Sequence, residues 1–219
     1  MERLAQLIEP VPVLDFTTAV CQWLQDAHEA AAELQPARRD TPRGNWDNNT
    51  SFGTDRYQFL RATAASLTAE LPGLEVDSSF QSVLLKLGRV GIYQLQSASG
   101  PHGSLAGASD LRRELLTTNG DQALISRRDI WLAGRELLFL LWNGTEEHGL
   151  TGAWAGQGEL FDNHIEWSWY VRLQDLNAGI DVPAQSAESV QSPLDPTIFD
   201  LPEPALRIRP RAEREQPSG

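Results

Sequence analysis

Residues 137–173, LLFLLWNGTEEHGLTGAWAGQGELFDNHIEWSWYVRL, combine one unbroken apolar run with two alternating ones. The unbroken run, Leu137–Trp142, is typical of a strand that is covered on both faces. Leu150–Leu160 and Ile165–Leu173 alternate between apolar and polar residues, as half-buried strands do. Polar turns separate the three segments, so the sequence predicts an antiparallel meander of three strands.

A turn centred on Asp162 and Asn163 predicts the pairing of the last two strands. It places aromatic residues opposite glycines, and an indole ring laid over a cross-strand glycine fills the missing side-chain volume. The run GAWAGQG is therefore interpreted as a packing feature rather than a phosphate-binding loop, and one face of the last strand is expected to be buried and the other solvated. The predicted pairs are Leu160 with Ile165, Gly158 with Trp167, Gly156 with Trp169, and Trp154 with Val171.

Upstream of the meander, two amphipathic helices and two more strands are predicted. Apolar residues at three-and-four spacing indicate a helix from the cap Asp15 to Pro36, and a second from the cap Thr54 to Leu71. The strands Phe80–Leu87 and Arg89–Gln96 meet in a tight turn at Gly88, and a short helix is expected over Ser109–Leu116. The predicted fold is α+β: two N-terminal amphipathic helices packed on a mainly antiparallel sheet of about five strands, forming a single domain over residues 1–176.

The C-terminal segment, residues 177–219, has a different composition. Between Asp175 and Ala205 the chain has six acidic residues, five prolines and no basic residue, and it ends in a weakly basic stretch. Such a segment cannot bury a core, so a disordered tail is predicted. A small apolar cluster within it could bind a partner groove: Leu194, Ile198, Phe199 and Leu201.

Charge and cysteine content limit the function classes. With 18 Lys and Arg against 30 Asp and Glu, the formal net charge is −12, which disfavours binding to a phosphate backbone. The single cysteine, Cys21, excludes an internal disulfide and fits a reducing compartment. No export signal or membrane-spanning segment is predicted, so the expected location is the cytoplasm, and a prokaryotic source is expected.

The sequence offers no recognisable catalytic pattern. Zinc-binding and nucleophile motifs are absent, and Cys21 and His28 are interpreted as packing or surface residues of the first helix. A metal-dependent nuclease would need an acidic residue and a Glu-x-Lys pair on neighbouring strands, but the segment after Asp77 and Lys86 reads GIYQLQ. No metal and no cofactor are therefore expected.

The best candidate site is the polar loop Gly44–Gly53, GNWDNNTSFG, together with the helix after it. It combines hydrogen-bonding side chains with an aromatic ring, as contact loops often do. Local turn formation and helix capping would explain the same residues. The residues expected to bind are Trp46, Asp47, Asn48, Asn49 and Tyr57.

Three functions remain open. The leading hypothesis is a non-catalytic protein-binding or accessory subunit of a larger cytoplasmic assembly, which uses the sheet surface, the 44–53 loop and the 194–201 segment. The alternative is an enzyme or small-ligand-binding protein with a pocket between helices and sheet near the 44–57 loop. A weaker alternative is an acidic inhibitor of a nucleic-acid enzyme.

Overall fold

The structure is a computed structural model that describes residues 1–40, 49–78, 83–97, 99–105, 131–161 and 163–177. All of these residues belong to one compact unit, Met1–Ser189. The predicted helix over 109–116, the predicted tail and its apolar cluster Leu194–Leu201 lie outside the described residues, so those predictions stay untested.

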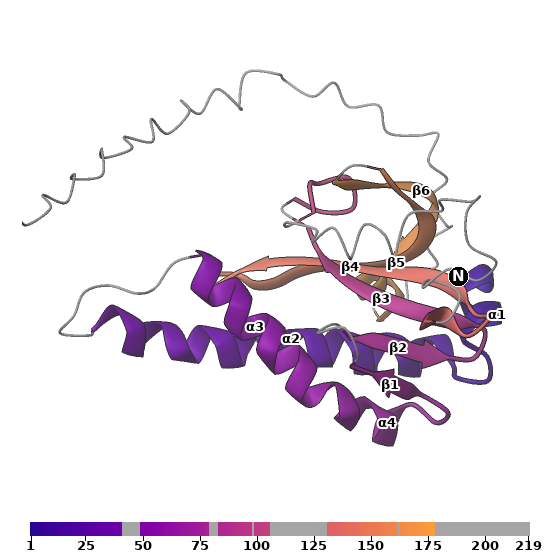
Figure 1. Ribbon diagram of the computed structural model, residues 1–219, viewed down its shortest axis with the longest axis horizontal. Helices are drawn as coiled ribbons and strands as arrows, with labels where there is room; N and C mark the ends of the chain where they lie inside the picture. The colour runs from indigo at the N-terminus through magenta and orange to yellow at the C-terminus, as the bar shows by residue number, and fades with distance from the viewer. Residues whose placement is uncertain (41–48, 79–82, 98, 106–130, 162, 178–219) are drawn as a thin grey trace, which may run out of the picture. The chain divides into compact units, whose positions relative to one another are not determined.

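The helices are concentrated at the N-terminal end of the chain (Figure 1). A short first helix precedes the two that the sequence predicts, and a short one follows the last strand. Their bounds are α1 Glu2–Ile8, α2 Val13–Arg39, α3 Asn49–Thr63, a 3-10 turn Ala64–Ser66, α4 Leu67–Glu70 and α7 Leu173–Asn177.

Both main helices start earlier than predicted. Asp15 lies in the first turn of α2 rather than at its cap, and α2 continues through Pro36 to Arg39. Proline removes one backbone donor, but the last turn still closes, with Asp40 N donating to Pro36 O at 3.2 Å. Thr54 lies inside α3, which begins at Asn49. Contacts between helices therefore outweigh the local stop and cap signals.

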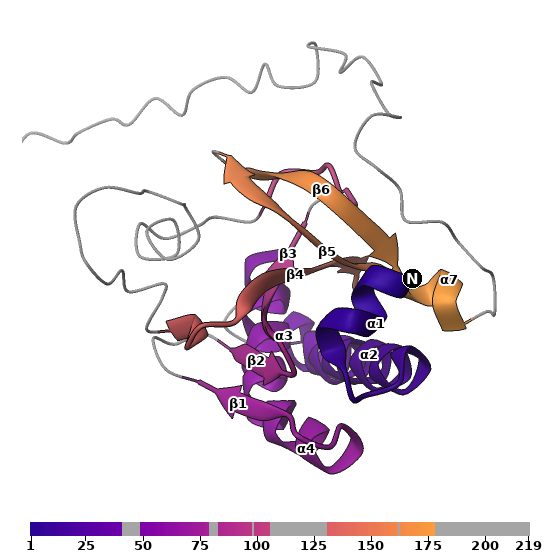
Figure 2. The ribbon, with the colours of Figure 1, turned by 90° about the vertical axis from the view of Figure 1, so that its right-hand side faces the viewer.

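Six strands form one sheet in the order β1-β2-β3-β4-β5-β6, one strand more than expected (Figure 2). Neighbouring strands are antiparallel except β3 and β4, which are parallel. The sheet is therefore mixed, because the segment between β3 and β4 returns the chain to the same end. The strands are β1 Glu75–Asp77, β2 Leu84–Leu87, β3 Val90–Gln96, β4 Glu136–Thr145, β5 Gly149–Phe161 and β6 His164–Arg172.

The helices cover one face of the sheet (Figures 1 and 2). Apolar residues of α1, α2, α4 and α7 form one core with alternate residues of the strands, such as Ile92, Leu140 and Val171. A second core lies on the opposite face and includes Tyr93, Phe139 and Trp167. On β6 the expected alternation holds in part: Glu166, Ser168 and Arg172 are exposed as predicted, whereas Tyr170 is buried in the second core.

A β-bulge at Ser168 changes the predicted pairing of β5 and β6. Gly158 pairs with Trp167 as predicted, but Gln157 pairs with Trp169, so Ser168 is an extra residue on β6. A bulge of this kind shifts every following residue to the other face. Trp167 accordingly lies in the second core and Trp169 in the helix-side core.

Because of the bulge, two other predicted pairs are wrong. Gly156 faces Tyr170 instead of Trp169, and Trp154 faces Arg172 instead of Val171. The glycine still serves packing, since a Cβ on Gly156 would lie 2.7 Å from the Cα of Tyr170. Its role is to let the two backbones approach closely.

Candidate functional site

Of the predicted site residues, the structure describes only part. Trp46, Asp47 and Asn48 lie outside the described residues. Asn49 is the first residue of α3, and its side chain is not among those described. Tyr57 is half-buried on α3, directly after a residue that the sequence reading overlooked, Arg56.

Arg56 is the centre of a buried polar cluster between the helices and the sheet. Its guanidinium lies over the rings of Trp142 on β4 and Phe52 on α3, with 4.4 and 4.9 Å from Cζ to the ring centroids. Its Nη1 lies 2.8 Å from Nε2 of His28 on α2 and donates to the carbonyl of Gly144 on β4 at 3.2 Å. Three elements that are distant in sequence thus meet at one cation.

The charge of Arg56 is unusual because its side chain is only 1% exposed. Burial lowers the pKa of the guanidinium to about 10, so it remains protonated at neutral pH. Its contacts are an imidazole, a carbonyl and two aromatic rings, and no carboxylate in the described part of the chain pairs with it. Arg56 is therefore a fixed positive charge stabilised by neutral groups.

His28 is the neutral partner of this cation and is itself 1% exposed. Burial, and secondly the charge of Arg56, lower its pKa to about 4. A guanidinium only donates hydrogen bonds, so Nε2 of His28 must accept and Nδ1 must carry the proton. That Nδ1 has no hydrogen-bond partner within the described ranges.

The cluster lies at the carboxyl ends of the parallel strands β3 and β4. Here Gln94 accepts a hydrogen bond from Nε1 of Trp142 at 2.9 Å, and Gln96 pairs with Trp142 in the strand register. In sheets with parallel strands, ligand sites commonly form outside the carboxyl ends. The position of the cluster in the fold is therefore one at which binding sites are common.

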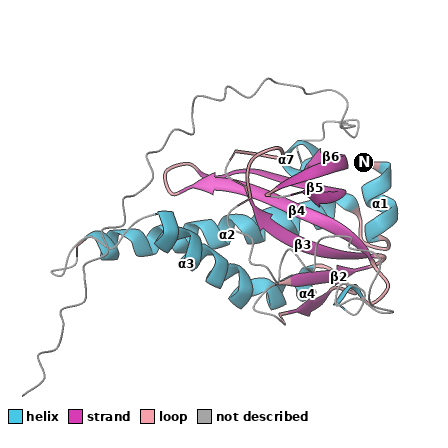
Figure 3. Ribbon diagram, turned by 45° about the horizontal axis from the view of Figure 1, so that its top comes forward, coloured by secondary structure: helices cyan, strands magenta, loops and turns pink. Residues whose placement is uncertain are grey.

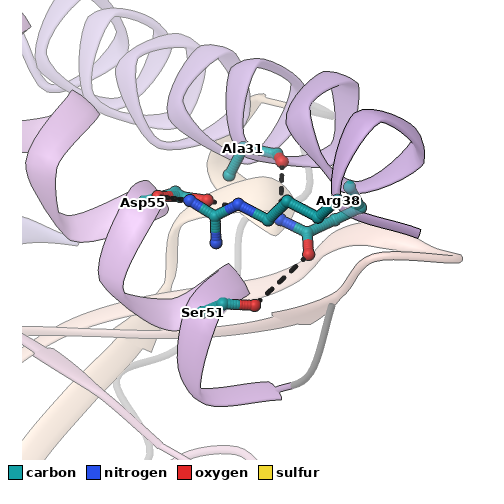
Figure 4. Close-up of polar contacts among 5 residues, drawn as sticks. Ala31, Arg38, Ser51 and Asp55 are labelled. Carbon is teal, nitrogen blue, oxygen red and sulfur yellow. Dashed lines mark hydrogen bonds and ion pairs between the residues drawn. The ribbon is translucent and has the colours of Figure 1, made fainter. Parts of the chain in front are cut away.

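A second polar layer lies further along α2 and α3 (Figure 4). Gln35, which is fully buried, donates to the carbonyl of Ala31 at 3.1 Å. Next to it, Arg38 forms an ion pair with Asp55 at 2.6 Å, and Oγ of Ser51 lies 3.5 Å from Oε1 of Gln35. The cation of this layer, Arg38, thus has a carboxylate partner, unlike Arg56.

A polar cleft of about 500 Å³ lies at the opposite ends of β3 and β4. Three of its charged side chains are connected: Arg89 donates to Glu136 at 3.3 Å, and Gln157 connects Glu136 with Arg3 at 3.1 and 2.8 Å. It is lined by Glu2, Arg3, Gln6, Leu7, Arg89 and Glu136.

The other residues considered for catalysis do not form a reactive set. Burial raises the pKa of the Cys21 thiol to about 11, which disfavours the thiolate. Lys86 donates to Asp77 at 2.8 Å, but the residue opposite Asp77 is the buried Leu84, where a nuclease would need a second carboxylate. Within the described residues, no three His, Cys, Asp or Glu side chains are placed to hold a metal ion.

One sequence signal could have revealed the cluster. Arg56 lies four residues after Phe52 and four before Leu60, on the apolar stripe of α3. His28 likewise follows Leu24 by four residues on the apolar stripe of α2. A cation and an imidazole on facing apolar stripes indicate a buried polar contact.

The fold and the cluster define an α+β protein with a mixed six-stranded sheet and a buried cation at the carboxyl end of its parallel strand pair. No known protein family, curated protein or solved structure matches the chain. In the described ranges, no single helix is long and apolar enough to cross a membrane, and only α1 and α2 counted together, at an angle of 81°, reach that length and composition.

Proposed function

We propose that the chain is a non-catalytic binding protein, an accessory subunit of a larger cytoplasmic assembly, whose recognition site is the buried polar cluster around Arg56. The observation that carries the proposal is the charge of Arg56, which is held in the interior without a carboxylate among the described residues. A buried charge of this kind costs several kcal/mol. A position that carries such a cost is better explained by recognition than by stability.

The electrostatics of the cluster favour binding over turnover. A proton-transfer group works best with a pKa near the ambient pH, whereas the pKa of His28 is about 4 and that of Arg56 about 10. At neutral pH both groups therefore keep one protonation state. Such a pair can attract and orient an anionic group, but it is poorly suited to exchange a proton with it.

Comparison of two matched variants in native extract tests the proposal. The full-length chain, tagged and expressed at its natural level, should co-purify with a stoichiometric partner. Arg56→Met should lose that partner, whereas Arg89→Met, which changes an exposed arginine at the opposite end of β3, should keep it. Circular dichroism confirms that both variants are folded.

Two outcomes would contradict the proposal. One is a wild-type chain that is recovered without any stoichiometric partner. The other is a chain that converts a substrate at a rate that depends on His28, since the proposal assigns His28 no proton transfer.

A further inference from the structure

The arginines of the described residues differ in whether a carboxylate accompanies them. Five of them lie within 4.0 Å of a carboxylate oxygen, and all five have solvent-exposed side-chain area. These pairs are Arg38 with Asp55, Arg39 with Glu146, Arg89 with Glu136, Arg135 with Glu75 and Arg172 with Asp175. Three described arginines, Arg3, Arg56 and Arg61, have no such pair, and of these only Arg56 is buried.

The unmet hydrogen-bonding capacity of the cluster consists of donors. Both hydrogen bonds of Arg56 use Nη1, and its buried Nε–H has no partner in the described part of the structure. The protonated Nδ1 of His28 is a second buried donor without a partner there. A buried donor that lacks a partner costs about 1–3 kcal/mol. An acceptor with negative charge would satisfy both the donors and the charge.

The aromatic rings restrict the shape of that acceptor. The ring centroids of Trp142 and Phe52 lie 4.4 and 4.9 Å from Cζ of Arg56, so two ring systems occupy part of the space around the guanidinium. A carboxylate is planar and can lie in the plane of a guanidinium with two parallel hydrogen bonds. A tetrahedral phosphate needs space above and below that plane. The crowded surroundings of the guanidinium therefore favour the smaller, planar carboxylate.

Several residues beside the buried core of the cluster are partly exposed. Gly144, whose carbonyl binds Arg56, is half-buried, and so are Gly53 and Tyr57 on the neighbouring positions of α3. Gln96, near Gly53, is also half-buried. Partly exposed residues thus lie directly beside the cluster on this side.

We propose that the edge of Arg56 binds a carboxylate group supplied by the binding partner, an acidic side chain or a chain terminus, which takes the place of the missing counter-charge. The proposal rests on the proposed function, because it names the chemical group that the recognition site accepts. A free carboxylic acid would offer the same group, and it serves as the probe.

The test is a titration of the full-length chain with sodium succinate, with sodium chloride at equal ionic strength as the reference. The readout is the Nε–H proton resonance of Arg56, which lies beside two aromatic rings and is assigned by its contacts to Phe52 and Trp142. The chemical shift of this resonance should change with added succinate, and the change should saturate at millimolar concentrations. Sodium chloride should leave the chemical shift unchanged. The measurement needs no substitution, so it does not depend on a variant that folds.

Variants and a second anion make the test specific. For the variants the readout is the indole Nε1–H resonance of Trp142, which lies beside residue 56. Arg56→Lys keeps the charge but loses the planar donor edge, and it should weaken succinate binding at least tenfold. Arg89→Lys, an exposed control, should leave binding unchanged. The inference is overturned if succinate leaves the chemical shift of the Arg56 Nε–H unchanged, or if inorganic phosphate binds as tightly as succinate. It is also overturned if both variants weaken succinate binding equally.

The two proposals fail in different ways. If a partner co-purifies but succinate leaves Arg56 unaffected, the carboxylate inference is wrong and the binding function stands. If succinate binds Arg56 but no partner is recovered, the subunit role is wrong. A peptide from the recovered partner distinguishes a protein carboxylate from a free acid, because it should compete with succinate at lower concentration.

Discussion

Two ends of the contact between α2 and α3, the helix pair drawn in Figure 3, differ sharply. At one end Leu24 and Leu60 are 1% and 0% exposed and pack in the helix-side core. One helical turn further, the equivalent positions are His28 and Arg56, which are equally buried. The same geometry is thus filled by hydrocarbon at one end and by a polar pair at the other.

This difference separates stability from recognition. Burial of leucine stabilises the fold by about 1.5–3 kcal/mol per side chain, and the apolar end consists of such residues. At the polar end this stabilisation is absent, and the desolvation of a cation and an imidazole costs free energy instead. The hydrogen bonds of the two groups offset only part of that desolvation cost. On the proposed function, apolar contact area is replaced by polar groups at the recognition site.

The largest effect is expected at the apolar end. Leu60→Ala removes a fully buried side chain from a packed interface and should lower the free energy of unfolding by about 3 kcal/mol. Urea denaturation of the full-length chain measures it. A loss below about 1 kcal/mol would show that the apolar end is loosely packed and would remove the contrast between the ends.

A smaller loss is expected from Gly144→Ala at the polar end. A Cβ at this position would overlap the carbonyl of Gly149 and lie 2.7 Å from Cε1 of His28, which is buried and cannot retreat. Overpacking of this kind costs about 1–3 kcal/mol. Thermal unfolding should show the loss.

The matched control is Gly53→Ala on α3. A Cβ there meets only Oε1 of Gln96 at 3.9 Å. Alanine in a helix is favoured over glycine by roughly 0.5–1 kcal/mol, so this variant should be slightly more stable than the wild type. Equal destabilisation by both changes would contradict the close packing of His28 against β4.

The sequence predicted the parts of the fold that rest on local patterns. The α+β class, the two amphipathic helices and the meander all follow from periodicity, as does the turn at Gly88, which has a φ of +52°. The features it missed depend on tertiary contacts. A three-residue strand such as β1 has no period to detect, and the parallel pairing of β3 with β4 depends on the path of the chain between them.

The sequence predicted the neighbourhood of the candidate site but not its central residues. The prediction led to the segment that begins α3 and to Tyr57, which neighbours Arg56 in the chain. It did not consider Arg56, and it interpreted His28 as a packing or surface residue of one helix. The contact between these two residues forms only when the two helices pack together, and the residue pattern of a single helix does not predict it.

The acid sensitivity of the fold sharpens the comparison further. His28 has a pKa of about 4 when folded and an ordinary value of 6.5 when unfolded, so the unfolded state binds the proton more readily. Stability from this group is therefore complete above pH 6.5 and is lost as pH falls toward 4. The loss at pH 5 is on the order of 1–2 kcal/mol.

Comparison with His28→Gln isolates this contribution, because carboxylates elsewhere in the chain also titrate in acid. The free energy of unfolding of the wild type should fall more between pH 7 and pH 5 than that of the variant. Parallel pH curves for the two proteins would mean that the polar end is hydrated and that His28 titrates normally.

The smallest change in stability is expected from Arg56→Met, although Arg56 is as buried as Leu60. Methionine keeps the apolar stem and its contact with Trp142 and Phe52, and it removes the desolvated charge. Against this gain stand two acceptors that lose their donor, Nε2 of His28 and the carbonyl of Gly144. Because replacement of buried ionic groups by apolar ones is often neutral or stabilising, the free energy of unfolding should change by less than about 1 kcal/mol in either direction.

Urea denaturation measures this change. A loss of 3 kcal/mol or more would instead mean that Arg56 stabilises the fold, and the two ends of the helix pair would then serve the same purpose.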